Sequence, residues 1–542
     1  MSKPLSNLLK CVHAVFTDQG RKHIVAQKDG ILYIAGGLML YPSPDLGYNG
    51  PNTVLRSLNV SKGFQTSLDS VNYIRTEEIP SIVPGVSDAA FFPTESGFDL
   101  TFGVWWPYNS TIYGNRDPPS EDQKWQYEIA TRQWTSTEIT LRNWVQTNTS
   151  TRVSSSMTVW IPSLKAGFFF GGNFVATMGS SLEVVDLEEH NGLITYNYAT
   201  NTWTNETTPL GGISEGGLVH ITTATDEVLI QLGGRSEWAT RLACDSRKFS
   251  EINIYSVNQS KWYTQYLPPG AVAPTPRFAF CIALKSASDG SSHQIYIMGG
   301  LEASTLVDAT GGLTTGTIWV LSIPSFEWAQ LPYTSKTMAA DPGGRISPKC
   351  QPIGEHYIFY YGGRNAPSYS SSITCDSKAN AAFLFDVNTL TWTDEFTPSE
   401  GTYEIPSKVL ALIGGDKTGG SPKRAPAKGW SHPDLETIMT LKDPPMPHGT
   451  NVGAIAGGTV GGVMGIALGL LSAMIVRRRH QRRISQLPPK PVELPSTCAG
   501  ALEESGSPAE LMENNQVDRG GVRASELPSG DVGREINSRH WN

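Results

Sequence analysis

The chain has 542 residues and carries 42 Lys+Arg against 50 Asp+Glu, a formal net charge of −8. No basic surplus is present to hold a phosphate backbone, which disfavours nucleic-acid binding. There are 54 Gly and 36 Pro, and only 17% of the residues are charged. This composition is typical of a globular fold with many turns and argues against a helical bundle or a coiled coil.

An apolar stretch that ends in a pair of small residues recurs along residues 15–415. The second position of each pair falls at 37, 104, 172, 234, 300 and 363, so the steps between pairs are nearly equal. An aromatic residue follows each pair at a nearly constant distance: Phe64, Trp134, Trp203, Trp262, Trp328 and Trp392. Two landmarks with the same period over six repeats indicate a repeat architecture.

Each repeat contains four predicted strands: one before the pair, one that ends in the pair, an alternating apolar strand, and one that opens with the aromatic residue. A single four-stranded sheet cannot bury both of its apolar faces, so the copies are expected to stack around a shared axis. Residues 1–415 are therefore predicted to form an all-β propeller with six complete repeats. A seventh pair, Gly414-Gly415, ends the apolar residues 409–413 and leaves a seven-bladed ring open.

In its glycine pairs and spaced Trp residues, the chain resembles the kelch-repeat family. Arg152, Arg277 and Arg345 lie ahead of three repeats, where that family usually has an arginine. The wider layout is similar to fungal kelch proteins of the galactose-oxidase-like propeller group, of the single-pass, cell-wall-anchored type. Two positions depart from the family pattern, because Phe64 stands for Trp in the first repeat and Val104 for Gly in the second.

Copper-radical oxidases share the propeller that this resemblance implies. They hold one metal with two His, two Tyr and a Cys cross-linked to a Tyr. The ten His of this chain are isolated in the sequence, so we predict no catalytic residue, no metal and no cofactor. The expected role is a non-catalytic binding module whose loops contact a protein or a cell-wall polysaccharide, and the aromatic residues within 104–108 suit a sugar ring. A copper-radical oxidase-like enzyme and an intracellular kelch scaffold are the alternatives.

The cysteines and the glycosylation sequons indicate whether the propeller can lie outside the cell. Cys350 and Cys375 flank the strand of the sixth glycine pair, and Cys244 and Cys281 flank the start of the fifth repeat. Two local disulfides are therefore predicted if the ring is extracellular, and buried free thiols are the alternative. Five sequons permit N-glycosylation of a glycoprotein: Asn59, Asn109, Asn148, Asn205 and Asn258.

Beyond the propeller, residues 416–451 are rich in Gly, Pro, Lys and Ser and are predicted to form a stalk. Residues 452–476 form a stretch of 25 uncharged positions, enough to cross a bilayer as one helix. Five arginines within 477–483 follow, so the C-terminus is predicted to be cytoplasmic and the propeller external. The tail, 477–542, has few large apolar residues and is predicted to be disordered.

The predicted membrane helix carries a glycine at every fourth position, which forms a smooth stripe suited to close packing with a second helix. These glycines are Gly453, Gly457, Gly461, Gly465 and Gly469. This helix is therefore expected to pair either with a second copy of itself, forming a homodimer, or with another helix that has a face of small residues. Residues 1–15 lack the apolar core of a secretory signal, so we expect a leader upstream of Met1; a propeller that faces the cytosol is the alternative.

Overall fold

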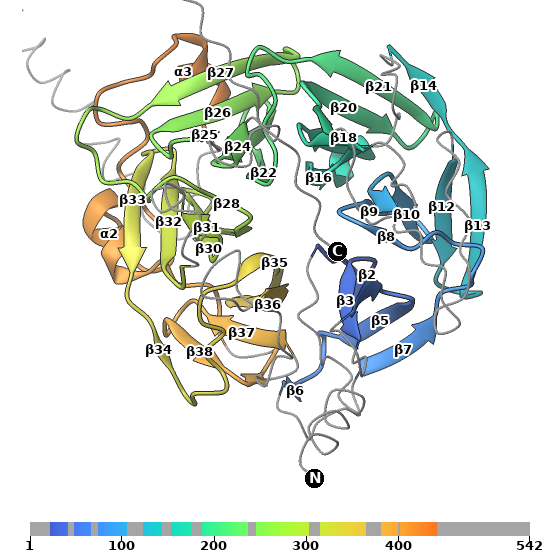
Figure 1. Ribbon diagram of the computed structural model, residues 1–542. Coiled ribbons are helices and arrows are strands. Elements are labelled where there is room, and N and C mark those ends of the chain that lie inside the picture. Colours follow the sequence, from blue (N-terminus) through green and yellow to red (C-terminus); the bar gives the residue numbers. More distant parts are fainter. Residues whose placement is uncertain are drawn as a thin grey trace, which may run out of the picture. The chain divides into compact units, whose positions relative to one another are not determined.

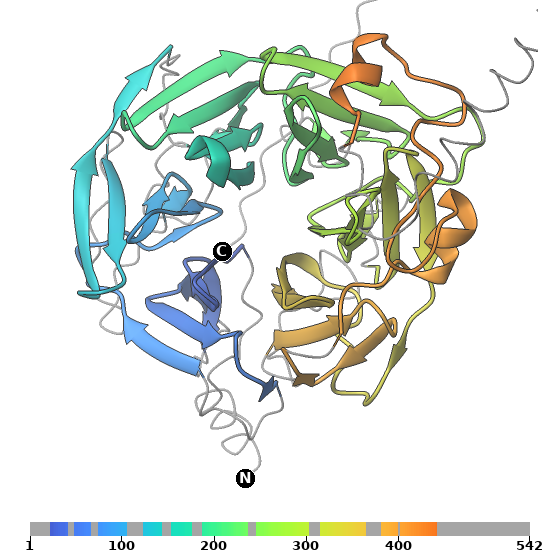
Figure 2. The same ribbon diagram turned by 180° about the vertical axis from the view of Figure 1, so that it is seen from behind.

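The computed structural model describes residues 22–41, 48–66, 74–105, 123–143, 153–175, 187–236, 245–302, 315–364, 381–398 and 401–441. Within these ranges, six antiparallel sheets stand around one axis (Figures 1 and 2). Each sheet is here called a blade, numbered 1 to 6 in chain order. The prediction of an all-β propeller is confirmed, and the number of blades is six.

Each blade has four antiparallel strands in chain order from the axis outward. Blade 1 contains β1 (Ile24–Lys28), β2 (Ile31–Ala35), β5 (Val54–Asn59) and β7 (Ile74–Glu78). Blade 2 contains β9 (Ala90–Pro93), β10 (Gly97–Thr101), β12 (Gln123–Glu128) and β13 (Gln133–Glu138). Blade 3 contains β16 (Met157–Ile161), β17 (Ala166–Phe170), β20 (Gly192–Asn197) and β21 (Thr202–Thr207).

The second half of the ring repeats this arrangement. Blade 4 contains β22 (Gly217–Thr222), β23 (Glu227–Leu232), β26 (Glu251–Ser256) and β27 (Lys261–Tyr266). Blade 5 contains β29 (Cys281–Ser286), β30 (His293–Met298), β32 (Ile318–Ile323) and β33 (Glu327–Leu331). Blade 6 contains β35 (Ile346–Ile353), β36 (Tyr357–Arg364), β37 (Ala382–Asp386) and β38 (Thr391–Thr393). Two short strands, β14 (Thr140–Arg142) and β34 (Thr334–Ser335), join the outer edges of blades 3 and 6 in parallel.

The predicted Trp residues are the second residues of the fourth strands in blades 2 to 6 and pack between neighbouring blades. Trp203 is fully buried: its ring stacks on Tyr196 with centroids 4.2 Å apart and meets the edge of Phe102 at 4.9 Å. In each of these blades, the Trp pairs with a third-strand residue seven positions earlier, which is aromatic in four of the five. The side chain of the third strand and the Trp thus enter the interface together.

Phe64 does not open the fourth strand of blade 1, so that prediction is wrong. It lies in β6 (Phe64–Gln65), which pairs with β39 (Glu395–Phe396) after blade 6, while β7 takes the fourth position. The rings of Phe64 and Phe396 lie 4.9 Å apart in the core between blades 6 and 1. Pairing the two chain segments at the seam of the ring leaves fewer open edges there.

The glycine pairs follow the second strands in blades 1, 3, 4 and 5 and lie near the end of β36 in blade 6. Their backbone has a positive φ that favours glycine. Gly171 has a φ of 62°, and a Cβ at this position would lie 1.9 Å from the carbonyl oxygen of Ile213, which precedes blade 4. Arg345 is fully buried and its Nη1 donates to the carbonyl oxygens of Gly362 and Gly363, at 3.3 and 3.2 Å. Arg277 likewise reaches the carbonyl of Gly299, whereas Arg152 lies outside the described residues.

A buried ion pair within blade 2 is hydrogen-bonded to a tyrosine of blade 3. Lys124 and Asp99 are 3% and 0% exposed, and Lys124 Nζ lies 2.7 Å from Asp99 Oδ2. The Tyr196 hydroxyl donates to the same carboxylate oxygen at 2.6 Å and lies 2.6 Å from Lys124 Nζ. Burial, reinforced by Asp99, raises the pKa of Tyr196, so the hydroxyl keeps the proton that it donates to the carboxylate.

Residues 401–441 form a strap along the outside of blades 4 to 6 rather than a seventh blade (Figure 1). The apolar run 409–413 belongs to a helix, α2 (Ser407–Ile413), which buries Val409 and Ile413 one turn apart against β32 and β33. A short apolar run fits a helix as well as a strand, and here the helical spacing places both side chains on one face. The seven-bladed alternative is therefore wrong.

The region expected to be a stalk also belongs in part to this strap. α3 (Asp434–Ile438) lies beside β27, and its residues Leu435 and Ile438 pack into the core between blades 4 and 5. Met439 and Leu441 join them, so residues 416–441 fold onto the propeller and the boundary at residue 415 is too early.

The predicted span 452–476 with its glycine stripe, and the tail 477–542, lie outside the described residues. In the ranges described, no helix is long and apolar enough to cross a membrane.

Candidate functional site

Each blade begins its first strand next to a residue with left-handed backbone, close to the axis. These residues are Lys22, Asp88, Ser155, Glu215, Ala279 and Ser347, with φ from 53° to 64°. Backbone amides join neighbours around the axis: Asp88 donates to Lys22 at 3.1 Å, Glu215 to Ser155 at 3.0 Å, Ala279 to Glu215 and Ser347 to Ala279 at 2.7 Å. We call these six residues the axial ring.

Side chains of the axial ring form an ion network across blades. Lys22 Nζ lies 2.5 Å from Asp88 Oδ2 and 3.7 Å from Glu215 Oε1, and it also bonds the Ser155 hydroxyl at 3.2 Å. Arg235, which follows the glycine pair of blade 4, lies 2.7 Å from Glu215. Four blades thus contribute charged or polar groups to one end of the axis.

Next to the axial ring, the first strands of all six blades enclose a central cavity of about 410 Å³. Its walls come from β1, β9, β16, β22, β29 and β35. Polar lining residues include Thr158, Lys349 and Gln351, while Phe91 and Phe280 are among the apolar ones. A cavity of this size falls within the range that small-molecule sites occupy in proteins.

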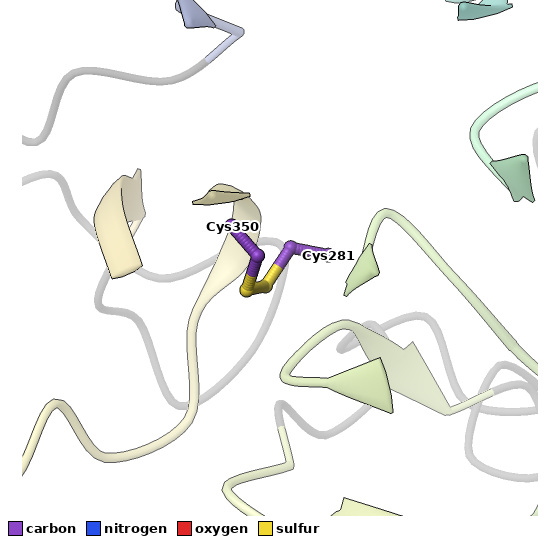
Figure 3. The surroundings of a disulfide bond; sticks show 2 residues. All are labelled: Cys281 and Cys350. Atoms are coloured by element: carbon purple, nitrogen blue, oxygen red, sulfur yellow. A yellow bond between two sulfur atoms is a disulfide. The ribbon is translucent and has the colours of Figure 1, made fainter. Parts of the chain in front are cut away.

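A disulfide between Cys281 and Cys350 crosses the wall of the central cavity (Figure 3). It joins the innermost strands of blades 5 and 6, with Cα atoms 5.4 Å apart and a sequence separation of 69. This differs from the local pairs predicted, Cys281 with Cys244 and Cys350 with Cys375. The reason is that first strands of adjacent blades meet near the axis, although a whole repeat separates them in sequence. Cys244 and Cys375 lie outside the described residues.

Two histidines next to glycine pairs serve the packing of the blades. His23 Nδ1 lies 2.7 Å from the carbonyl oxygen of Gly36, and His190 Nδ1 lies 2.9 Å from that of Gly171. Burial lowers the pKa of His23 to about 3 and also lowers that of His190, so both rings are neutral at pH 7. Over the residues that the structure describes, no three His, Cys, Asp or Glu side chains converge as a metal site.

The connections between strands differ in length on the two faces of the propeller. Those from the first to the second strand are short turns: 29–30, 94–96, 162–165, 223–226, 287–292 and 354–356. Those from the second to the third strand are several times longer: 36–53, 102–122, 171–191, 233–250, 299–317 and 365–381. Because the end of the second strand lies beside the start of the first, all six long connections begin at the axial-ring end. We call this end the long-loop face.

Short strands extend the blades on the long-loop face. They are β3 (Leu38–Tyr41) with β4 (Tyr48–Pro51), β8 (Val86–Ser87) with β11 (Val104–Trp105), β15 (Val153–Ser154) with β18 (Asn173–Val175) and β19 (Leu187–Glu189), β24 (Arg235–Ser236) with β25 (Asp245–Ser246), and β28 (Arg277–Phe278) with β31 (Leu301–Glu302). Val104, which replaces the expected glycine, is the first residue of β11, and the preceding Gly103 takes the positive φ of 84°. The long connections of blades 1 to 5 therefore start from short paired strands.

The structure describes three of the five predicted glycosylation sites. Asn258 is exposed in the turn after β26, where its Nδ2 donates to the carbonyl of Thr225 at 2.8 Å. Asn59 and Asn205 are half-buried: Asn59 Oδ1 accepts from Ser61, and Asn205 Oδ1 lies 3.0 Å from His190 Nε2. Asn109 and Asn148 lie outside the described residues.

Comparison with known proteins identifies the type of repeat. No known family profile matches the chain. A kelch repeat-containing protein of Arthroderma benhamiae is 26% identical over 358 residues, which cover 55% of this chain and 51% of that protein. The repeats resemble kelch repeats. The chain spans about half the length of this curated relative.

Proposed function

We propose that this chain is a membrane-tethered kelch propeller that acts, without catalysis, as a binding module at the cell surface. The observation that carries the proposal is the difference between the two faces: all six long connections start on the long-loop face, and only short turns join the first and second strands on the other. Long connections on a rigid scaffold are the usual location of binding surfaces, since the blades hold the loop bases in place. The ligand is therefore expected on the long-loop face.

A cell-wall polysaccharide is the ligand to test first, and a protein ligand is the other outcome. The connection 102–122 contains Trp105, Trp106 and Tyr108 near its start, and flat aromatic rings stack on the apolar faces of sugars. The external location draws support from the disulfide between Cys281 and Cys350, because disulfides persist in oxidising compartments. The tether is the uncharged segment 452–476, followed by arginines that favour the cytoplasmic side.

The binding test uses cells that display the full chain and insoluble cell-wall particles. Replacing Trp105, Trp106 and Tyr108 together with Ala should reduce retention on the particles at least tenfold. The matched control changes Glu95 and Lys165 to Ala, an exposed ion pair in two short connections on the opposite face. If both variants bind like the unchanged chain, the polysaccharide is not held by these residues; a protein recovered through the long-loop face would replace it as ligand.

Topology is tested separately on the same cells. Protease added outside should remove the propeller and leave a C-terminal tag protected, and a glycosidase should increase the mobility of the chain on a gel. Asn258→Gln should remove one glycan, since Asn258 is the exposed site among those described. A protected propeller that carries no glycan would contradict the external location.

A further inference from the structure

We propose that the central cavity is a second binding site, for a small hydroxylated carboxylate such as a sugar acid, and that Lys349 selects this ligand by its charge. The site lies on the propeller axis and does not depend on the ligand of the long-loop face. It rests on the charges around the cavity, the position of Lys349 and the chemistry of the walls.

The charges beside the cavity do not cancel. Asp88 and Glu215 are matched by Lys22 and Arg235, at 2.5 and 2.7 Å. Lys349 adds a third cation, and the described part of the chain places no carboxylate within 4.0 Å of its Nζ and no hydrogen-bond acceptor within bonding distance. The neighbouring His23 is neutral. Among these described groups, three cations face two carboxylates, an excess of one positive charge.

The ammonium of Lys349 lies close to the axis. It lines the cavity from β35 of blade 6, yet it interacts electrostatically with Asp88 of blade 2, Lys22 of blade 1 and Glu215 of blade 4. Groups from blades on opposite sides of the ring act on one side chain only if that side chain is near the centre. The adjacent Cys350 is tied to blade 5 by the disulfide, so the backbone at Lys349 is fixed in place before any ligand binds.

A bound anion would remove an unfavourable state of this lysine. Lys349 is half-buried, and partial desolvation lowers its pKa below the usual value, because an ammonium that loses part of its water without gaining a bonded anion is costly. A carboxylate beside the Nζ would supply a charge-assisted hydrogen bond, which is stronger than a neutral one. The environment of Lys349 therefore favours an anion over a neutral molecule.

The walls indicate what the rest of the ligand is. A cavity of about 410 Å³ exceeds what an inorganic anion fills and suits a ring-sized molecule. Thr158, His220 and Gln351 offer donors and acceptors for hydroxyl groups, and Phe91 and Phe280 offer flat apolar contacts. A carboxylate head at Lys349 with a hydroxylated ring in the remaining space matches these surroundings.

The test measures binding of D-glucuronate to the purified full chain in nanodiscs, by titration calorimetry, with methyl glucoside as the neutral analogue. Glucuronate should bind with one site per chain, and methyl glucoside at least tenfold more weakly. Lys349→Gln should weaken glucuronate binding about 10- to 100-fold, the range for loss of a charged hydrogen bond. Lys349→Arg should retain part of the affinity, and the exposed control Lys165→Gln should retain all of it.

A second measurement avoids any effect of substitution on folding. In the unchanged protein, glucuronate should protect Lys349 from acylation by an amine-reactive ester, as read by peptide mass spectrometry, and methyl glucoside should not. Sulfate that competes with glucuronate would support the site, since both need the same ammonium. Equal binding of the charged and neutral sugars, unchanged labelling of Lys349, or no glucuronate binding at 10 mM, on the order of the weakest specific contacts, would overturn the proposal.

Discussion

Removing the disulfide between Cys281 and Cys350 should lower the stability of the propeller by an amount that the length of the closed loop sets. The two cysteines are 69 positions apart, and a loop of that size restricts the unfolded chain by about 4 kcal/mol. At about 2.1 cal/mol/K of unfolding entropy per residue over roughly 400 folded residues, this corresponds to a fall of about 5 °C in the melting temperature. Local pairs with Cys244 or Cys375 would close shorter loops and stabilise less.

The assay compares thermal unfolding of the full chain with that of the double variant Cys281→Ala with Cys350→Ala. Cys498→Ala is the matched control, because Cys498 lies in the tail beyond the predicted span and should leave the melting temperature unchanged. Non-reducing peptide mapping of the unchanged chain should recover one peptide pair that contains Cys281 and Cys350. The reasoning is refuted if the double variant melts within 1 °C, roughly the error of the assay, or if the map links either cysteine to another partner.

Three further changes test the packing. Trp203→Ala should cost about 3–5 kcal/mol in a denaturant titration because the indole is fully buried between blades 2 and 3; a loss below about 1 kcal/mol would contradict this. Asp99→Leu should cost about 3–5 kcal/mol by leaving buried Lys124 unpaired, and adding Lys124→Met should recover most of that loss; equal stability of the single and double variants would argue against the pair. The pKa of His23 is about 3 in the folded chain, against the ordinary value of 6.5 expected in the unfolded chain. Between these two pH values the unfolded chain therefore binds more protons than the folded chain. Stability should therefore fall as the pH drops below 6.5, by about 2–3 kcal/mol from this group at pH 4.5; His23→Gln should reduce that pH dependence, and an unchanged profile would assign it elsewhere.

The repeat could be predicted from the sequence because its two landmarks have local physical causes. The glycine pair marks a positive φ that other residues adopt only at a cost, as at Gly171. The Trp pairs with a third-strand residue seven positions earlier, as Trp203 does with Tyr196, so a fixed spacing follows from one hairpin. Both signals lie within a single blade and need no knowledge of its neighbours.

Errors arose where a segment's partner comes from a distant part of the chain. Phe64 has the spacing of the blade-1 Trp, but the edge offered by β39, more than 300 positions later, pairs with its strand. Likewise, the apolar pattern of residues 409–413 fits a strand, but in the structure these residues belong to α2, which packs on β32 and β33. No local pattern specifies such partners, because ring closure and the outer wall form only when the blades assemble.

The axial ring is missed for a different reason. Its members, among them Lys22, Ser155 and Ala279, share a left-handed backbone but no side-chain chemistry, and loops of different lengths separate them from the glycine pairs. The charges of Lys22, Asp88 and Glu215 meet only because six blades converge on one axis. Lys349 follows the same rule, since nothing around it in sequence distinguishes it from a solvated lysine.

Blade 6 is held on both sides, which explains how the centre of the ring keeps a defined shape. The disulfide fixes β35 to blade 5, and β39 continues from blade 6 to pair with β6 at the start of the chain. α2 packs over the neighbouring β33 from outside. A propeller without these links would open most easily at the seam between its first and last blades, where the chain is discontinuous. Because both borders of blade 6 are fixed, the position of Lys349 on β35 is set by the ring, and a ligand at the axis meets a preformed charge.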